Sequence, residues 1–168
     1  MAIYIDVSSA VHAKAGIGRY AESLARALVD LAPDRFALFY NRVRGSLPPT
    51  GLAGVAARTV RAGYKPWRMA VWAGHALGIG FNRLVPEAEL FHATEHLLPP
   101  LRDAPTVLTV HDMIFKLFPE HQKRLNFWYL NATMPLFCRR ADAIITVSQS
   151  SKRDIVKHYG LPDEKVSV

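Results

Sequence analysis

Two short clusters of polar residues follow apolar runs of the kind that form buried strands, and their residue types suit the binding of an anionic or hydroxyl-bearing ligand. Gly16-Ile17-Gly18-Arg19 comes after the run Ile3 to Val7 and opens an amphipathic segment, and His111-Asp112 directly follows the run Thr106 to Val110. The carboxyl ends of parallel strands meet at one edge of a sheet, and ligands of open α/β sheets bind outside that edge. The two clusters therefore predict part of an active-site cleft.

The pair Gly16 and Gly18 has two explanations. Glycines at a helix N-terminus let backbone N–H groups approach an anionic ligand closely, whereas a turn can need glycine only for a positive φ angle. The pattern Gly16-x-Gly18-x-x-Ala21 formally matches the dinucleotide fingerprint, but residues 8–15 separate it from the strand and no acid ends the second strand near residues 39–41. A nicotinamide dinucleotide site is therefore disfavoured.

His111 is expected at the carboxyl end of a central strand, where a side chain can reach a bound ligand. A histidine there can donate a hydrogen bond to a hydroxyl or carbonyl group, or act as a base near neutral pH. The alternative is a structural histidine that is satisfied by a nearby backbone group. Asp112 can bind a hydroxyl group or cap the next turn, and both interpretations stay open.

Two further polar clusters are expected at the same edge of the sheet. One ends the predicted strand 89–93 and contains His92, Thr94, Glu95 and His96; the other, Ser148 to Ser151, follows the predicted strand 143–147. His92 and His96 stand at a strand end rather than on a helix, so no metal site is predicted. Ser148 and Ser150 lie outside any nucleophile-elbow sequence and are expected to cap a helix.

Strands alternate with helices along the chain. The expected strands are 3–7, 36–40, 56–62, 89–93, 106–110 and 143–147, with a further strand or linker beginning at 164–168. The expected helices are 18–31, 66–81, 120–140 and a short last helix. Pro86 follows the second helix, and the third has Pro119 at its start and a kink at Pro135. The last helix lies between the capping box Ser151-Lys152-Arg153-Asp154 and Gly160. This alternation predicts an α/β fold, a Rossmann-like parallel sheet of six or seven strands with helices on both faces.

Composition restricts the class of protein. A length of 168 residues, half of them apolar, fits a single domain, and the lone Cys138 excludes an internal disulfide and suits a reducing cytoplasm. No signal peptide pattern opens the chain, and no uninterrupted apolar stretch of about 18 residues occurs. The chain stops just after a complete helix-to-strand unit, which predicts that it is the N-terminal piece of a longer protein.

The net charge of +7 favours anionic partners such as phosphorylated small molecules or acidic lipid headgroups. The basic residues are scattered and lack the aromatic interleaving or groove-entering motif of a nucleic-acid module, so no nucleic acid is expected as a partner. The tryptophans of the predicted helix 67–81 are expected to pack against the sheet. The second interpretation of this helix is contact with a membrane surface.

Five motifs, taken in order and spacing, resemble the N-terminal domain of family 4 retaining glycosyltransferases with the GT-B fold, including mannosyltransferase-like members. The motifs are Gly16-Ile17-Gly18-Arg19-Tyr20, Leu90-Phe91-His92-Ala93-Thr94, Thr109-Val110-His111-Asp112, the run from Arg140-Ala141-Asp142 to Val147-Ser148-x-Ser150-Ser151, and Lys165-Val166-Ser167-Val168. The resemblance implies that residues 1–168 form the acceptor-side Rossmann-like domain. A C-terminal domain that binds most of a nucleotide-sugar donor is absent from the chain, which is expected to be inactive alone.

The resemblance also implies roles for individual residues in retaining transfer of a sugar from a nucleotide diphosphate sugar to an acceptor hydroxyl. His111 would lie beside the transferred sugar. Gly16, Gly18 and Arg19 would approach the donor phosphates or the acceptor, and Thr94, Glu95 and Asp112 would line the acceptor side. No cofactor and no metal are implied. The acceptor would be a glycan or a lipid-linked molecule, which predicts a cytoplasmic protein with peripheral contact at the inner face of the membrane.

Two other functions stay open at this point. One is a nicotinamide-type dinucleotide-binding domain of an oxidoreductase, against which the displaced glycines and the missing acid argue. The other is a non-catalytic module that binds a glycan or a partner protein.

Overall fold

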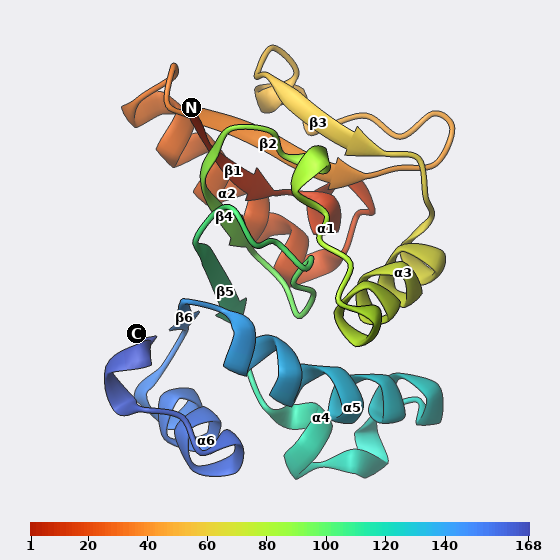
Figure 1. The fold of residues 1–168 in the computed structure, drawn as a ribbon, viewed down its shortest axis with the longest axis vertical. Helices are drawn as coiled ribbons and strands as arrows, with labels where there is room; N and C mark the ends of the chain where they lie inside the picture. The colour runs from red at the N-terminus through yellow and green to blue at the C-terminus, as the bar shows by residue number, and fades with distance from the viewer.

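The computed structural model describes residues 1–168, and its centre is a seven-stranded sheet in which every neighbouring pair of strands is parallel (Figure 1). The strands are β1 (Ala2–Asp6), β2 (Phe36–Asn41), β3 (Ala57–Val60), β4 (Ala88–Ala93), β5 (Thr106–Val110), β6 (Ala143–Thr146) and β7 (Val166–Ser167). Their order is β3-β2-β1-β4-β5-β6-β7, so the winding direction reverses between β1 and β4. The predicted Rossmann-like α/β fold is confirmed, and the topological switch point lies between these two strands.

Helices cover both faces of the sheet. The α-helices are α1 (Ser8–Val11), α2 (Ala15–Leu31), α3 (Tyr64–Leu77), α4 (Ile114–Leu117), α5 (Arg124–Arg140) and α6 (Gln149–Tyr159). Short 3-10 turns are η1 (Thr50–Leu52), η2 (Asn82–Leu84), η3 (Pro119–His121) and η4 (Asp163–Lys165). The larger apolar cluster packs α3, α5 and α6 with the sheet, and a smaller cluster packs α2 and η1 against β1 and β2.

The segment after β1 differs from the sequence-based expectation. Helix α2 begins at Ala15, three residues before the predicted start, and the expected loop contains the short helix α1. The two helices meet at Gly18, where an added Cβ would lie 2.8 Å from the carbonyl oxygen of Ser9. Neither Gly16 nor Gly18 has a positive φ angle, so the turn explanation is wrong for both. Gly18 is instead required by close backbone packing.

Two other helix boundaries are corrected. The long helix α5 begins at Arg124 rather than Glu120, because α4 and η3 occupy the preceding residues and Pro119 opens η3. Helix α3 ends at Gly78, which adopts φ of 67° and so terminates the helix before Pro86 is reached.

Helix α6 begins at Gln149 because the Ser148 hydroxyl accepts a hydrogen bond from the Ser151 N–H at 3.1 Å. The predicted capping box at Ser151 is therefore replaced by a cap three residues earlier, and Ser148 is confirmed as a capping residue. The end of this helix at Gly160, with φ of 61°, is as predicted.

Helix α3 packs on the sheet through its tryptophan nearest the N-terminus. Trp67 and Val71 are buried in the larger apolar cluster, as the packing interpretation predicts, whereas Met69 and Trp72 are partly exposed. None of the helices has both the length and the apolar character needed to cross a bilayer.

The contact at Gly18 generates a matched pair of substitutions. Gly18→Ala should lower the free energy of unfolding by about 1–3 kcal/mol, because its Cβ would press on the Ser9 backbone. Gly16→Ala should be neutral or stabilising by up to about 1 kcal/mol, because nothing lies within 4 Å of an added Cβ and alanine favours the helix. Urea unfolding of both variants measures the difference, and equal stability would contradict the packing explanation.

Candidate active site

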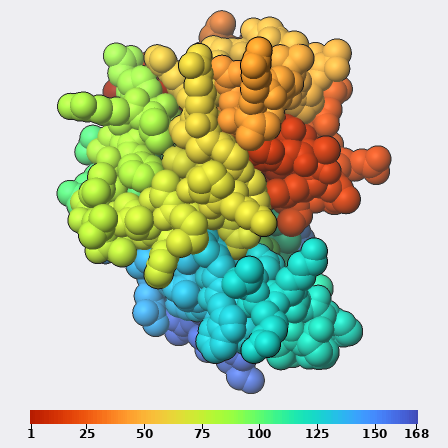
Figure 2. Space-filling model, turned by 90° about the vertical axis from the view of Figure 1, so that its right-hand side faces the viewer, coloured from red at the N-terminus to blue at the C-terminus, as the bar shows by residue number.

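The four polar clusters meet at the carboxyl edge of the sheet. Strands β1, β2 and β3 all point to the right in Figure 1, and Figure 2 looks onto that side, with the N-terminal residues in red, α3 in yellow and the start of α5 in cyan. The polar residues that follow β1 and β4 lie side by side because these strands pair directly. His111 follows β5, the next strand, and Ser148 follows β6.

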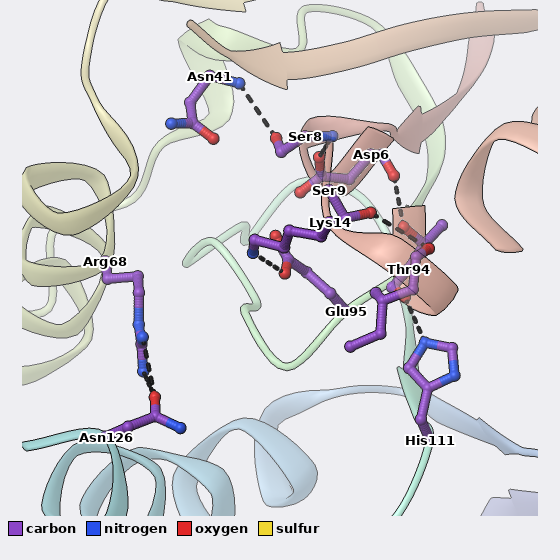
Figure 3. A network of polar contacts seen from close by, with 11 residues as sticks. Asp6, Ser8, Ser9, Lys14, Asn41, Arg68, Thr94, Glu95, His111 and Asn126 are labelled. Carbon is purple, nitrogen blue, oxygen red and sulfur yellow. Dashed lines mark hydrogen bonds and ion pairs between the residues drawn. The ribbon is translucent and has the colours of Figure 1, made fainter. Parts of the chain in front are cut away.

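Buried hydrogen bonds join the ends of β1, β2 and β4 (Figure 3). The Thr94 hydroxyl donates to the Asp6 carbonyl oxygen at 2.6 Å, and Asp6 Oδ1 accepts from the Ser8 N–H at 2.8 Å. Ser8 Oγ in turn accepts from the Asn41 N–H at 3.1 Å. Asp6, Ser8, Asn41 and Thr94 are fully buried. Polar groups therefore join the carboxyl ends of three strands in addition to the apolar packing of the sheet.

A partly buried ion pair crosses the same junction. Lys14 Nζ donates to Glu95 Oε2, and the Glu95 side chain is only 5% exposed. The Lys14 ammonium group also lies 3.4 Å from the centroid of the Tyr64 ring, a cation–π contact. Since Lys14 precedes α2, Glu95 follows β4 and Tyr64 opens α3, this one cation ties three elements together at the switch point.

Burial shifts the pKa values of three titratable groups here. Burial raises the pKa of Asp6 to about 7, and the nearby charge of Glu95 adds to the shift, while hydrogen bonds from Ser8 and the charge of Lys14 oppose it. Burial lowers the pKa of His96 and that of His92 to about 4 each. Both histidines are therefore neutral at physiological pH, and Asp6 exchanges its proton near pH 7.

His111 is oriented by two contacts. Its Nε2 lies 3.0 Å from the Thr94 carbonyl oxygen, and its ring meets the Tyr20 ring edge-to-face with centroids 4.8 Å apart. A carbonyl oxygen only accepts, so Nε2 carries a hydrogen, and Nδ1 makes no hydrogen bond to the protein. The backbone contact expected of a structural histidine is thus present, yet one nitrogen stays available for a ligand.

Unpartnered buried polar atoms concentrate at this edge. Seven buried side-chain nitrogen or oxygen atoms lack a hydrogen-bond partner, and five of them lie here: Asp6 Oδ2, His12 Nε2, Asn41 Oδ1, Glu95 Oε1 and His96 Nε2. Each such group costs free energy of folding, and folded proteins tolerate few of them. Strain of this kind is typical of functional sites.

The predicted glycine loop contributes less than expected to an open anion site. The Gly18 N–H donates to the Lys14 carbonyl oxygen at 2.6 Å inside the first turn of α2, so it is not available to a ligand. Gly16 and Arg19 are exposed in that turn, and the Gly16 N–H belongs to the first residues of the helix, which have no intrahelical acceptor. Asp112 Oδ1 accepts from the Ile114 N–H at 3.0 Å, which confirms the turn-capping interpretation.

The histidines of the third cluster point to different partners. His92 Nε2 lies 2.8 Å from Thr109 Oγ1, whereas the His96 ring stands beside His111, with centroids 6.1 Å apart, and beside Phe115. Sequence reasoning missed Asp6 and Lys14. The sequence contains a signal for Asp6, since it is the only charged residue of the apolar strand β1. It contains none for Lys14, because the partner Glu95 is 81 residues away.

One well-defined cavity of the chain lies elsewhere. It has a volume of about 640 Å³ and opens beyond the amino ends of β5 and β6, between the end of α3, residues 98–106 and the start of β6. None of the predicted site residues lines it. We place the site at the carboxyl edge, because the unpartnered polar atoms and the switch point coincide there.

Comparison with known families identifies the class of protein that this fold and edge belong to. The family model described as Glycosyltransferase Family 4 matches residues 15–168, which include α2, β4 and His111 but not β1. The chain therefore belongs to glycosyltransferase family 4, and its sheet is the one expected of a GT-B N-terminal domain. Membership in this family argues against the alternative of a dinucleotide-binding oxidoreductase domain. No curated protein matches the sequence.

The raised pKa of Asp6 makes stability depend on pH. Between about pH 4 and pH 7 the unfolded chain loses this proton while the folded chain keeps it, so the contribution of Asp6 to the free energy of unfolding falls as pH rises. Asp6→Asn keeps the acceptor for Ser8 but carries no titrating proton. As pH rises from 4 to 8, the free energy of unfolding of the variant should increase relative to that of wild type by up to about 4 kcal/mol.

Urea unfolding of wild type and Asp6→Asn at several pH values measures this gain. Asp34→Asn, at an exposed turn position, is the matched control and should show no such trend. A stability difference that stays constant across the pH range would contradict the assignment to Asp6.

Proposed function

We propose that this chain is the acceptor-side domain of a retaining glycosyltransferase that moves a sugar, mannose being the first to test, from a nucleotide diphosphate donor to an acceptor hydroxyl. Family membership supports sugar transfer in general. The observation that carries the site is the orientation of His111, whose Nε2 is held by the Thr94 carbonyl oxygen while Nδ1 stays unpartnered. A second, donor-binding domain facing this edge would complete the cleft.

His111 binds the transferred sugar by accepting a hydrogen bond. In the tautomer with the hydrogen on Nε2, the ring offers Nδ1 as an acceptor to a sugar hydroxyl. Thr94 acts as a positioning residue, since its carbonyl oxygen holds the ring and its hydroxyl is used on Asp6. Glu95 is also buried, and it acts through Lys14 rather than by direct contact with the acceptor.

The remaining predicted residues have exposed or partly exposed groups at the same edge. Gly16, through its backbone N–H, and Arg19, through its guanidinium group, face the donor diphosphate across the N-terminus of α2. The second carboxylate oxygen of Asp112 faces the acceptor, while Oδ1 keeps the turn. In the reaction the acceptor oxygen bonds to the anomeric carbon, the bond to the diphosphate oxygen breaks, and the acceptor proton passes to the leaving diphosphate.

The proposal is tested by donor hydrolysis and sugar transfer across common nucleotide sugars. The assay is run on this chain and on the product of the complete reading frame that encodes it. Turnover with the longer protein and none with the 168-residue chain is the expected result. A folded longer protein without hydrolysis or transfer for any donor would favour a binding module instead.

Within the active protein, His111→Ala should lower kcat on the order of a hundredfold, the typical cost of removing one preorganised hydrogen bond from a transition state. The circular dichroism spectrum should stay unchanged. His121→Ala is the control, because this histidine is exposed on η3, where its ring lies beside Glu120 and Phe118. Equal transfer rates in the two variants would remove His111 from the site.

A further inference from the structure

Three arginines line another cavity, at the ends of strands β2 and β3. Its volume is about 450 Å³ and its lining residues are Arg42, Val43, Arg44, Arg61 and Gly63. We call this cavity the arginine pocket. Figure 2 shows residues around 40–62, in orange and yellow-orange, in the upper part of the face that carries the carboxyl edge of the sheet. In the sequence the basic residues look scattered, but the fold brings these three together.

The register of the sheet forces two of these arginines to stand side by side. Strands β2 and β3 pair in parallel with Asn41 opposite Val60, so Arg42 and Arg61 are the next residues on the two chain segments. The Arg42 N–H donates to the Val60 carbonyl oxygen at 2.8 Å, and the buried Asn41 side chain donates to the Ala62 carbonyl oxygen at 2.8 Å. Like charges side by side on neighbouring strands destabilise a sheet.

No carboxylate compensates this concentration of positive charge. Residues 35–86 contain eight lysines and arginines but neither aspartate nor glutamate. The ion pairs of the structure involve none of the three pocket arginines. Arg42 Nε donates to Thr59 Oγ1 at 3.3 Å, whereas the guanidinium groups of Arg44 and Arg61 make no hydrogen bond to the protein. Most of the donors at this pocket are therefore available to a ligand.

The donors of the arginine pocket match a phosphate group. A guanidinium group binds phosphate through two parallel N–H donors, and several arginines together neutralise its double charge. The pocket volume lies within the range of small-molecule sites. Helix α3 begins beside the pocket after Gly63, with no side-chain cap and no acid in its first turn, so the positive end of its dipole adds to the field.

We propose that the arginine pocket binds the phosphate group of a phosphorylated sugar acceptor. The pocket arginines carry the anion site, while its assignment to the acceptor rests on the proposed function. Strand β2 lies three strand spacings, about 14 Å, from β5, which His111 follows. The phosphate therefore belongs to a part of the acceptor remote from the hydroxyl that receives the sugar. The pocket thereby selects acceptors by charge.

A nuclear magnetic resonance titration of the isotope-labelled 168-residue chain tests this proposal without any assay of sugar transfer. Mannose 6-phosphate should shift the amide and arginine side-chain signals of residues 42–46 and 61–65, and mannose should not. Arg42→Gln and Arg61→Gln should each raise the Kd for mannose 6-phosphate about tenfold, because each removes charge-assisted hydrogen bonds. The Tm of Arg61→Gln should not fall, since the substitution relieves a like-charge contact.

Matched controls keep the charge change and alter its location. Arg83→Gln lies in the same acid-free segment but outside the pocket, and Arg153→Gln lies on α6; both arginines are exposed, and both variants should bind like wild type. Absence of binding, or equal losses in the control and pocket variants, would overturn the proposal.

Two further probes separate the possible sources of the phosphate. Guanosine diphosphate carries the phosphates of a sugar donor, and glycerol 3-phosphate carries that of a lipid headgroup. Tighter binding of mannose 6-phosphate than of either probe in the arginine pocket is the expected result. Tighter binding of one of the other two would overturn the assignment to a sugar acceptor. A failed transfer assay would contradict the proposed function but leave the measured anion binding unaffected.

Discussion

The register of β1 against β4 at the switch point is the constraint on which the rest of the site depends. These strands are far apart in the sequence, and their carboxyl ends are joined by a buried hydrogen bond from Thr94 to Asp6 and by the ion pair of Lys14 with Glu95. In a water-poor environment such polar contacts are strong when satisfied and costly when broken. Small displacements of either strand would therefore be resisted.

This junction controls the group most suited to chemistry. The Thr94 carbonyl oxygen, which follows β4, also binds Nε2 of His111 after β5. The orientation of the imidazole ring therefore depends on the β1–β4 contact. The unpartnered oxygens of Asp6 and Glu95 show that the junction is not optimised for stability alone. In the function that we propose, this rigid half-site holds the acceptor while a facing domain brings the donor.

The sequence by itself determined the fold class, the strands and the edge at which the polar clusters meet, because alternation of apolar runs and helical periods is a local signal. It also predicted His111, Thr94 and Glu95 as neighbours of the site. Only the tertiary structure decided that Thr94 and Glu95 are buried, that Gly18 packs on α1, and that Lys14 is the partner of Glu95.

The physical reason is that these outcomes depend on contacts between residues distant in the sequence. A pattern of apolar residues identifies which side of a strand or helix is covered, but the covering element is chosen by packing across the whole sheet. The observed helix starts at Ala15 and Arg124 differ from the predicted ones for the same reason, since short helical turns form in segments that look like loops in the sequence.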